Sequence, residues 1–261
     1  MNRLPRLVCV LLAVQLSAFM IGNPAQPALL MDGAFFGESP TWSFRVAFLD
    51  DYVYAQHFQS EFFGALDEKP PVLTLSTDAA LLTLNLHKWV DFYGIVGSAK
   101  LQMDEEIYTR RELAWGVGTK VVLYTWRNLR IGCDFKYFES NQKPLYFVSS
   151  GKALDIITRN VYLHYREIQG SLGISYKTTL LCPYIQCSYI GSKIEPHPGS
   201  FLVNVPGFSD PMDASMGSFI PKTRWGMAVG ATLIAGAKGT LALESRFFNQ
   251  NAIDASLELR F

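Results

Sequence analysis

Charged residues are scarce in this sequence, and neither sign of charge dominates. They make up 18% of the 261 residues, with 23 basic residues against 23 acidic ones, whereas about a quarter is usual in soluble domains. Since nucleic-acid binding normally depends on a basic field, this balance excludes nucleic acid as a partner. Aromatic residues nevertheless reach 13%. The composition therefore indicates that much of the surface faces something other than water.

Long apolar runs are also missing beyond the N-terminal region. No later segment reaches the ~18 to 20 consecutive apolar residues of a transmembrane helix, so a membrane crossing would have to use strands. The N-terminal run fits an export signal, because arginines precede an apolar stretch and small residues precede a cleavage point. The residues concerned are Arg3, Arg6, Leu7–Ala13, Ser17 and Ala18.

We expect residues 1–18 to be this signal peptide and residues 19–261 to form one exported domain, because no linker or charge block divides the rest of the chain. The alternative is a membrane-anchoring helix. Its apolar stretch, Leu7–Ile21, is interrupted by Gln15 and falls short of the ~20 residues that cross a bilayer, which favours the signal peptide.

Cysteine is rare, and its spacing excludes a zinc site. Of four cysteines, Cys9 lies in the expected signal peptide, which leaves Cys133, Cys182 and Cys187. None of the spacings matches CxxC or a zinc-ligand set. Cys182 and Cys187 would point to opposite faces of one strand and could not bridge each other. Whether any of the three forms a disulfide stays open.

The clearest positive pattern is the alternation of apolar and polar residues at the end of the sequence. From Ile253 to Phe261 every odd-numbered residue is apolar and every even-numbered one is polar. This period of two predicts a strand with one apolar and one polar face. Similar segments recur upstream at Ser43–Tyr54, Ala79–His87, Phe92–Met103, Leu113–Trp126, Arg130–Phe138, Glu167–Tyr176, Leu181–Tyr189, Trp225–Ile234 and Thr240–Phe247.

These segments favour a membrane barrel over a soluble β-sandwich. They commonly run for about 9 to 13 residues, which suits a tilted strand crossing a bilayer and exceeds the usual globular strand of about five or six. Alternation alone would fit either architecture, and the signal peptide, strand length and aromatic content decide between them. We therefore predict an all-β fold, a transmembrane antiparallel β-barrel of about 10 to 12 strands in the bacterial outer membrane, with lipid against its outer face.

The polar faces of the predicted strands would point into the lumen, and their residues are the candidate pore lining. One reading is a selectivity lining made by rings of charge; the other is that opposite charges pair and fill a closed interior. The mixture of signs argues against strong ion selectivity. The candidates are Glu244, Arg246, Asp254, Glu258, Arg260, Glu167 and Gln169.

A proline-rich stretch interrupts the strand pattern between residues 191 and 222. It contains Pro196, Pro198, Pro206, Pro211 and Pro221 and cannot be a regular strand throughout. Long connections of outer-membrane barrels lie outside the cell. We expect an outer loop, either folded toward the barrel mouth or simply exposed.

Several segments resemble the chlamydial major outer membrane protein family. They are Gly22–Pro27 with Leu29–Gly33, Leu82–Leu86 running on to Phe92, Tyr165–Tyr176 with Pro183–Ile185, and Gly226–Gly230 with Glu244–Phe261. The resemblance is discontinuous but reaches both ends of the chain. It implies a porin, trimeric in that family, that passes small solutes or ions and displays loops outside; keeping the family architecture would imply about 16 strands.

Two departures from that family matter. Its best-known member is considerably longer, so this chain should have shorter loops, fewer strands or both, and its pore could be narrow or plugged. The family is also cysteine-rich and cross-linked, whereas three cysteines remain here after the expected signal peptide. The disulfide network of the family is therefore not expected to transfer.

No nucleotide-binding, zinc-protease or serine-hydrolase motif occurs in a suitable context, so we expect no enzyme and no cofactor, catalytic or metal site. Two hypotheses remain: a diffusion porin that is also a surface structural protein, and a non-conducting structural or adhesive barrel whose loops bind a partner. Phe261 ends the last predicted strand, and we expect the outer-membrane assembly machinery to read that strand as its signal.

Overall fold

The fold comes from a computed structural model, which describes residues 22–26, 42–60, 71–86, 89–104, 107–149, 152–204, 210–235 and 239–260. The expected signal peptide and Phe261 lie outside the described residues, as does the side chain of Arg260. Within the described part, no helix is long and apolar enough to span a bilayer.

Ten antiparallel strands of the described residues form a closed ring, which lies within the predicted range of 10 to 12. The ring is therefore smaller than the 16-stranded barrel that the family architecture would imply. Closure is made by β1, which pairs with β2 on one side and with the last strand, β16, on the other. In ring order the strands are β1 (Trp42–Ser60), β2 (Val72–Leu86), β3 (Val90–Met103), β5 (Glu112–Trp126), β6 (Leu129–Gln142), β9 (Tyr162–Tyr176), β10 (Leu181–His197), β14 (Trp225–Ala235), β15 (Gly239–Phe247) and β16 (Asn251–Arg260).

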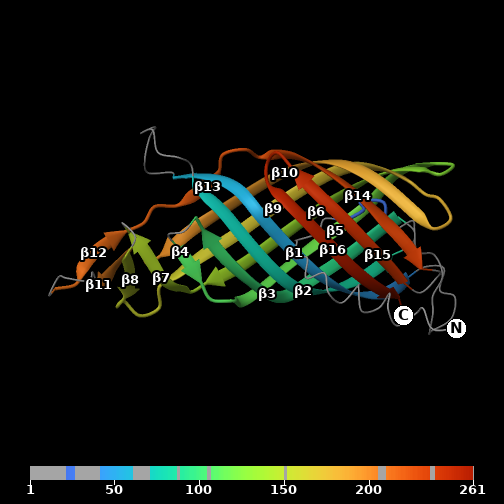
Figure 1. The fold of residues 1–261 in the computed structure, drawn as a ribbon. Helices are drawn as coiled ribbons and strands as arrows, with labels where there is room; N and C mark the ends of the chain where they lie inside the picture. Colours follow the sequence, from blue (N-terminus) through green and yellow to red (C-terminus); the bar gives the residue numbers. More distant parts are fainter. Residues whose placement is uncertain are drawn as a thin grey trace, which may run out of the picture.

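The two ends of the barrel differ in their connections. We call the end where β1 begins and β16 ends the terminal end, and the opposite end the loop end. The terminal end has tight connections, such as the turn at Arg127 and Asn128 between β5 and β6. Figure 1 shows further strands gathered beyond the loop end.

Five short strands at the loop end continue the hydrogen bonding of β3 into an outer sheet. Pairing runs from β3 through β4, β7, β8 and β11 to β12. The strands are β4 (Ile107–Thr109), β7 (Pro144–Ser149), β8 (Lys152–Ile156), β11 (Ser200–Asn204) and β12 (Met212–Ser215).

The predicted loop at 191–222 is wrong at its start, because β10 continues as a strand through His197. The rest is partly regular, since it contributes β11, β12 and β13 (Phe219–Pro221). Strand β13 pairs with β1 at Phe58 and with β10 at Ile194. It thereby joins two long strands across the loop end of the shorter β14, β15 and β16.

The outer face of the barrel is apolar and aromatic, as the alternation predicted. On β16, Ile253, Leu257 and Leu259 are exposed while Asp254 and Glu258 are buried. Aromatic residues mark both rims: Trp126 and Tyr176 lie near the terminal end, and the Tyr189–Trp225 ring pair lies toward the loop end. Such aromatic girdles flank the lipid-facing band of membrane barrels.

The inner face departs from the prediction that polar residues alone face the interior. Toward the loop end the inward side chains form one apolar cluster to which strands around the ring contribute. The cluster includes Leu49, Val53, Leu75, Ile95, Leu101, Phe138, Leu163, Tyr165 and Ile194. The physical reason is that side chains can fill the interior of a barrel this small, so its centre can pack as a dry core.

Candidate functional site

The barrel interior is the candidate site, and the structure places most predicted lining residues there. Glu167, Gln169, Glu244, Arg246, Asp254 and Glu258 are all buried on the inner face, none more than 5% exposed. Placement inside the barrel does not by itself make them the lining of a conducting path. They fall into two clusters rather than one ring.

The first cluster lies midway along the barrel and centres on Arg246 of β15. Its guanidinium donates a hydrogen bond from Nη2 to Asp51 Oδ1 at 2.8 Å, and its Nε lies 3.8 Å from Glu244 Oε1. Asp254 is paired in register with both Asp51 and Glu244 on the neighbouring strands. One arginine therefore faces three carboxyl groups, and a second ion pair nearby joins Lys136 to Glu167 at 2.7 Å.

Two tyrosines reach carboxylates by lying across glycines of the intervening strand. Tyr93 of β3 lies over Gly118 of β5 and donates a hydrogen bond to Asp134 of β6 at 2.7 Å. A Cβ at Gly118 would lie only 2.3 Å from the tyrosine ring, so the close approach requires glycine. The side chain spans three strands and ties them together from the inside.

The same arrangement recurs on the other side of the ring. Tyr184 of β10 lies over Gly230 of β14 and donates a hydrogen bond to Glu244 of β15 at 2.8 Å. Here a Cβ at the glycine would lie 2.4 Å from the ring. Gln186 adds a second hydrogen bond to the same Glu244 oxygen at 2.9 Å.

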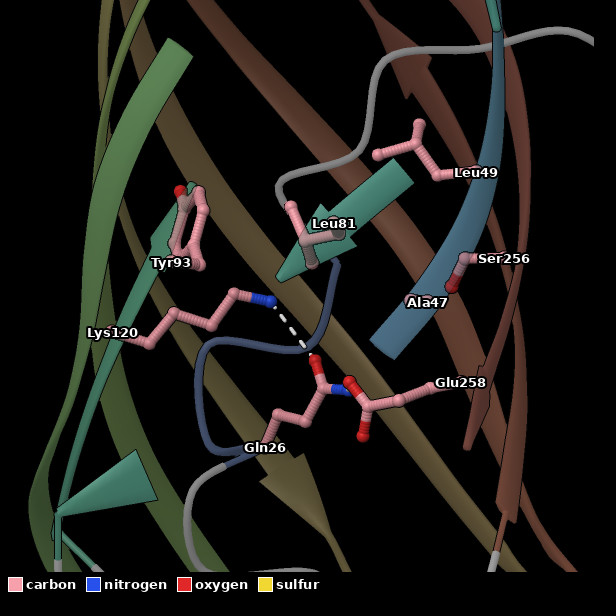
Figure 2. A pocket seen from close by; sticks show the side chains of 8 residues that line it. All are labelled: Gln26, Ala47, Leu49, Leu81, Tyr93, Lys120, Ser256 and Glu258. Atoms are coloured by element: carbon pink, nitrogen blue, oxygen red, sulfur yellow. Dashed lines mark hydrogen bonds between the residues drawn. The ribbon is translucent and has the colours of Figure 1, made fainter. Parts of the chain in front are cut away.

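The second polar cluster lies toward the terminal end and includes a segment that belongs to no strand. Residues Gly22–Gln26 lie inside the barrel, where Gln26 donates to Glu258 of β16 and accepts from Lys120 of β5, each at 2.9 Å. Figure 2 shows the Gln26 side chain between these two residues. Arg45 pairs with Asp91 and lies 3.4 Å from Glu258.

Interior charge is unbalanced, which the sequence reading missed. The buried charged side chains of the described residues comprise seven acids and four bases, each at most 6% exposed. They are Asp51, Asp91, Asp134, Glu167, Glu244, Asp254 and Glu258, with Arg45, Lys120, Lys136 and Arg246. Five of the six unpredicted residues, Arg45, Asp51, Lys120, Asp134 and Lys136, lie within segments that were predicted to be strands, and the alternation marked the faces of Asp134 and Lys136. The described interior therefore carries more acidic than basic side chains.

One small cavity lies inside the described part of the barrel. A cavity of about 20 Å³ lies beside Gln26, Tyr93, Lys120 and Glu258, which is room for about one water molecule. Toward the loop end the apolar cluster packs side chains against each other, with the Phe138 and Tyr165 rings 6.1 Å apart. No group of three or more His, Cys, Asp or Glu in the described chain is arranged to hold a metal ion.

The cysteines are placed as the strand argument predicted. Cys182 is buried on the inner face of β10, Cys187 is exposed on its outer face, and both are free, as is Cys133. Asn23 donates a hydrogen bond to the Cys182 sulfur at 3.3 Å. Cys182 thus lies directly beneath the Gly22–Gln26 segment.

The sequence is similar along nearly its whole length to porins of chlamydiae. A major outer membrane porin of Chlamydia psittaci is 22% identical over 376 aligned positions, which cover 95% of this chain and 96% of the relative. The serovar A porin of Chlamydia trachomatis is also 22% identical, with the same coverage. No protein-family model matches the sequence.

Solved structures with a similar trace are only remotely related in sequence. The translocator domain of the autotransporter NalP from Neisseria meningitidis is 8% identical, with a TM-score of 0.45, covering 85% of this chain and 88% of that one. The toluene transporter TbuX of Ralstonia pickettii is 11% identical, with a TM-score of 0.35, covering 94% of each chain.

Proposed function

We propose a function from the fact that the chain is a distant, full-length homologue of the chlamydial major outer membrane porins. The protein is a porin-type barrel whose lumen is closed in the conformation described. It also serves as a structural protein of the cell surface. It is an outer-membrane β-barrel that crosses the membrane with multiple strands. Its homologues are porins and not enzymes.

One observation carries the proposal: among the described residues, buried side chains and the Gly22–Gln26 segment occupy the interior toward both ends of the barrel. Ion pairs occupy the middle of the barrel, the Gly22–Gln26 segment lies toward the terminal end, and the apolar cluster lies toward the loop end. Passage of a solute would require these side chains to move. Water and small ions are the solutes to which such a path would open first, with cations ahead of anions because interior acids outnumber bases.

Orientation follows from the connections. Membrane barrels have short periplasmic turns and longer loops outside, so the terminal end faces the periplasm and the outer sheet of β4, β7, β8, β11 and β12 lies at the cell surface. The homotrimer and the reading of the Phe261 strand by the assembly machinery are part of the same proposal, with the resemblance as their support.

The second candidate is a barrel that never conducts and acts only as a structural or adhesive protein. The apolar cluster favours it, because a dry core gives water and ions no hydrogen-bonding partners. The outer sheet would then be the part that contacts a host or envelope partner. The two candidates differ in whether loosening the core creates a path.

Uptake of arabinose or potassium ions by proteoliposomes separates these candidates. We expect the wild-type protein to leave uptake close to that of protein-free vesicles, and the double variant Leu101→Ala, Phe138→Ala to increase it, because both side chains belong to the apolar cluster. The matched control is Leu172→Ala, which truncates an outward-facing leucine that is 53% exposed.

Each outcome assigns a function. Wild-type uptake as fast as that of an open diffusion porin would show that the barrel is not closed. A correctly folded double variant that still excludes potassium, even after Gly132→Ala is added to displace Pro24 from its contact with β6, would remove the porin half of the proposal and leave the structural barrel. Folding of each variant is checked by circular dichroism and by the gel shift between unheated and heated samples.

A further inference from the structure

The Gly22–Gln26 segment packs against two glycines on the inner wall of the barrel, which we call its seat. Gly132 of β6 and Gly173 of β9 are paired in register and both face inward. A Cβ at Gly132 would lie 2.5 Å from the Pro24 oxygen, and one at Gly173 would lie 2.7 Å from Pro24 Cγ. Any larger residue at these positions would occupy the space that Pro24 fills.

Polar contacts hold the segment at three separate strands. Asn23, which is 1% exposed, bonds to Cys182 of β10, while Gln26 joins Lys120 of β5 to Glu258 of β16. Strands β5 and β16 are not neighbours in the ring, so one side chain connects separate parts of the wall. The segment also stabilises its own bend, since Asn23 Oδ1 accepts a hydrogen bond from the Ala25 amide at 2.9 Å.

We propose that Gly22–Gln26 is an intramolecular plug that closes the periplasmic end of the lumen, with Pro24 seated on Gly132 and Gly173 and Gln26 as its latch. The plug is the device that keeps solutes and water from the charged half of the interior. The inference deepens the proposed function, because a conducting state would require the plug to leave its seat. Its polar, charge-bridging contacts are ones that water can replace, unlike the apolar cluster beyond it.

Access of a reagent to Cys182 tests the plug without requiring any conduction. In a background with Cys133→Ser and Cys187→Ser, a membrane-impermeant maleimide reports on Cys182 alone among the described cysteines. Cys182 is 0% exposed and lies beneath Asn23, so labelling should be slow in the protein purified from outer membranes. Intact mass gives the rate.

Gly132→Ala is the variant that should unseat the plug. The three nearest atoms to its added Cβ all belong to Pro24 and Ala25 rather than to the barrel wall, so the plug must move while β6 keeps its place. We expect labelling of Cys182 to become several-fold faster. The matched control is Gly170→Ala on the neighbouring strand β9, where nothing lies within 4 Å of an added Cβ and labelling should stay at the starting rate.

A disulfide crosslink that holds the segment in place completes the experiment. With Asn23→Cys, mild oxidation should join residue 23 to Cys182 and abolish labelling until a reductant is added. Failure of this crosslink to form would show that the segment does not sit at Cys182. A crosslink that forms, together with unchanged labelling of Gly132→Ala, would show a fixed part of the wall and no displaceable plug. Neither outcome decides solute uptake, so the proposed function is tested separately, by the transport measurements.

Discussion

The two halves of the barrel interior are both filled, but by different kinds of interaction. In the half nearer the terminal end, charged groups such as Arg246 and Asp51 pair with one another and the Gly22–Gln26 segment bridges the walls. In the half nearer the loop end, side chains such as Leu101 and Phe138 form a single apolar core. The stability of a buried charged pair depends on both partners being present, whereas the stability of an apolar core depends on the volume that its side chains fill. The charged half is thus the one that rearranges more readily, and the apolar half is the one that limits opening.

The largest expected effect comes from removing the arginine on which the charged half depends. Arg246→Met would leave Asp51, Glu244 and Asp254 buried without their common cation. Breaking a buried pair from one side costs about 3–5 kcal/mol, and we expect a loss of this size in the free energy of unfolding in lipid vesicles, measured with denaturant and tryptophan fluorescence.

The control for that prediction is an arginine outside the barrel. Arg166 pairs with Glu195 at 3.3 Å but its side chain is 46% exposed, so Arg166→Met should cost at most about 1 kcal/mol. Equal losses from the two variants would contradict the distinction between buried and exposed pairs.

In the apolar half the expected loss follows the volume removed. Leu101→Ala empties a site that is 0% exposed, and such truncations cost about 2–5 kcal/mol. The same truncation at Leu172, on the outer face, should cost much less because lipid can fill the space. Denaturant unfolding in vesicles compares them, and a reversed order would mean that the inner and outer faces are misassigned.

A smaller loss of stability is expected from removing one tyrosine hydroxyl that forms a hydrogen bond along the inner wall. Tyr184→Phe removes the hydrogen bond to Glu244 but keeps the ring over Gly230. Loss of one partner of a buried group costs about 1–3 kcal/mol, whereas Tyr176→Phe on the exposed outer face should be neutral. An unfolding midpoint for Tyr184→Phe that matches the wild type would show that the Tyr184 hydroxyl does not stabilise the barrel.

The smallest effect is a pH dependence on the outer face beyond the Tyr189–Trp225 pair, outside the membrane span. There the hydrogen bond from the Lys193 ammonium, aided by Arg166, lowers the pKa of the Glu195 carboxyl. The stabilisation is therefore present above the ordinary carboxyl pKa and is lost as pH falls through the lowered value. Glu195→Gln should lower the melting temperature slightly at neutral pH and not at acid pH, and a difference that persists in acid would contradict it.

Alternation predicted much of the barrel, because a strand that faces lipid on one side and a charged interior on the other has alternating apolar and polar residues. Leu257 beside Glu258 is such a case. The same rule fails toward the loop end, where Val53 and Leu101 face inward and apolar residues occur on both faces. Several predicted strands stop short of the loop end there; β10, for example, is predicted to end at Tyr189 and continues to His197.

The candidate site was only partly predictable, for a related reason. Period two puts Asp254 and Glu258 on the inner face, but it does not give the register between strands. Pairing of Asp254 with Asp51 and Glu244 depends on that register, as does the position of Gly118 beneath Tyr93. The placement of Gly22–Gln26 inside the lumen depends on contacts with residues distant in sequence, which no local pattern records.

Single-channel conductance in a planar bilayer tests the central claim, that both halves of the interior are closed, most directly. Wild-type protein purified from outer membranes should give no steady conductance steps in potassium chloride at low voltage. The charged half should be the first to admit ions, so Gly132→Ala alone should stay silent while the core remains packed. Steady steps of open-porin size from the wild-type protein would contradict the account.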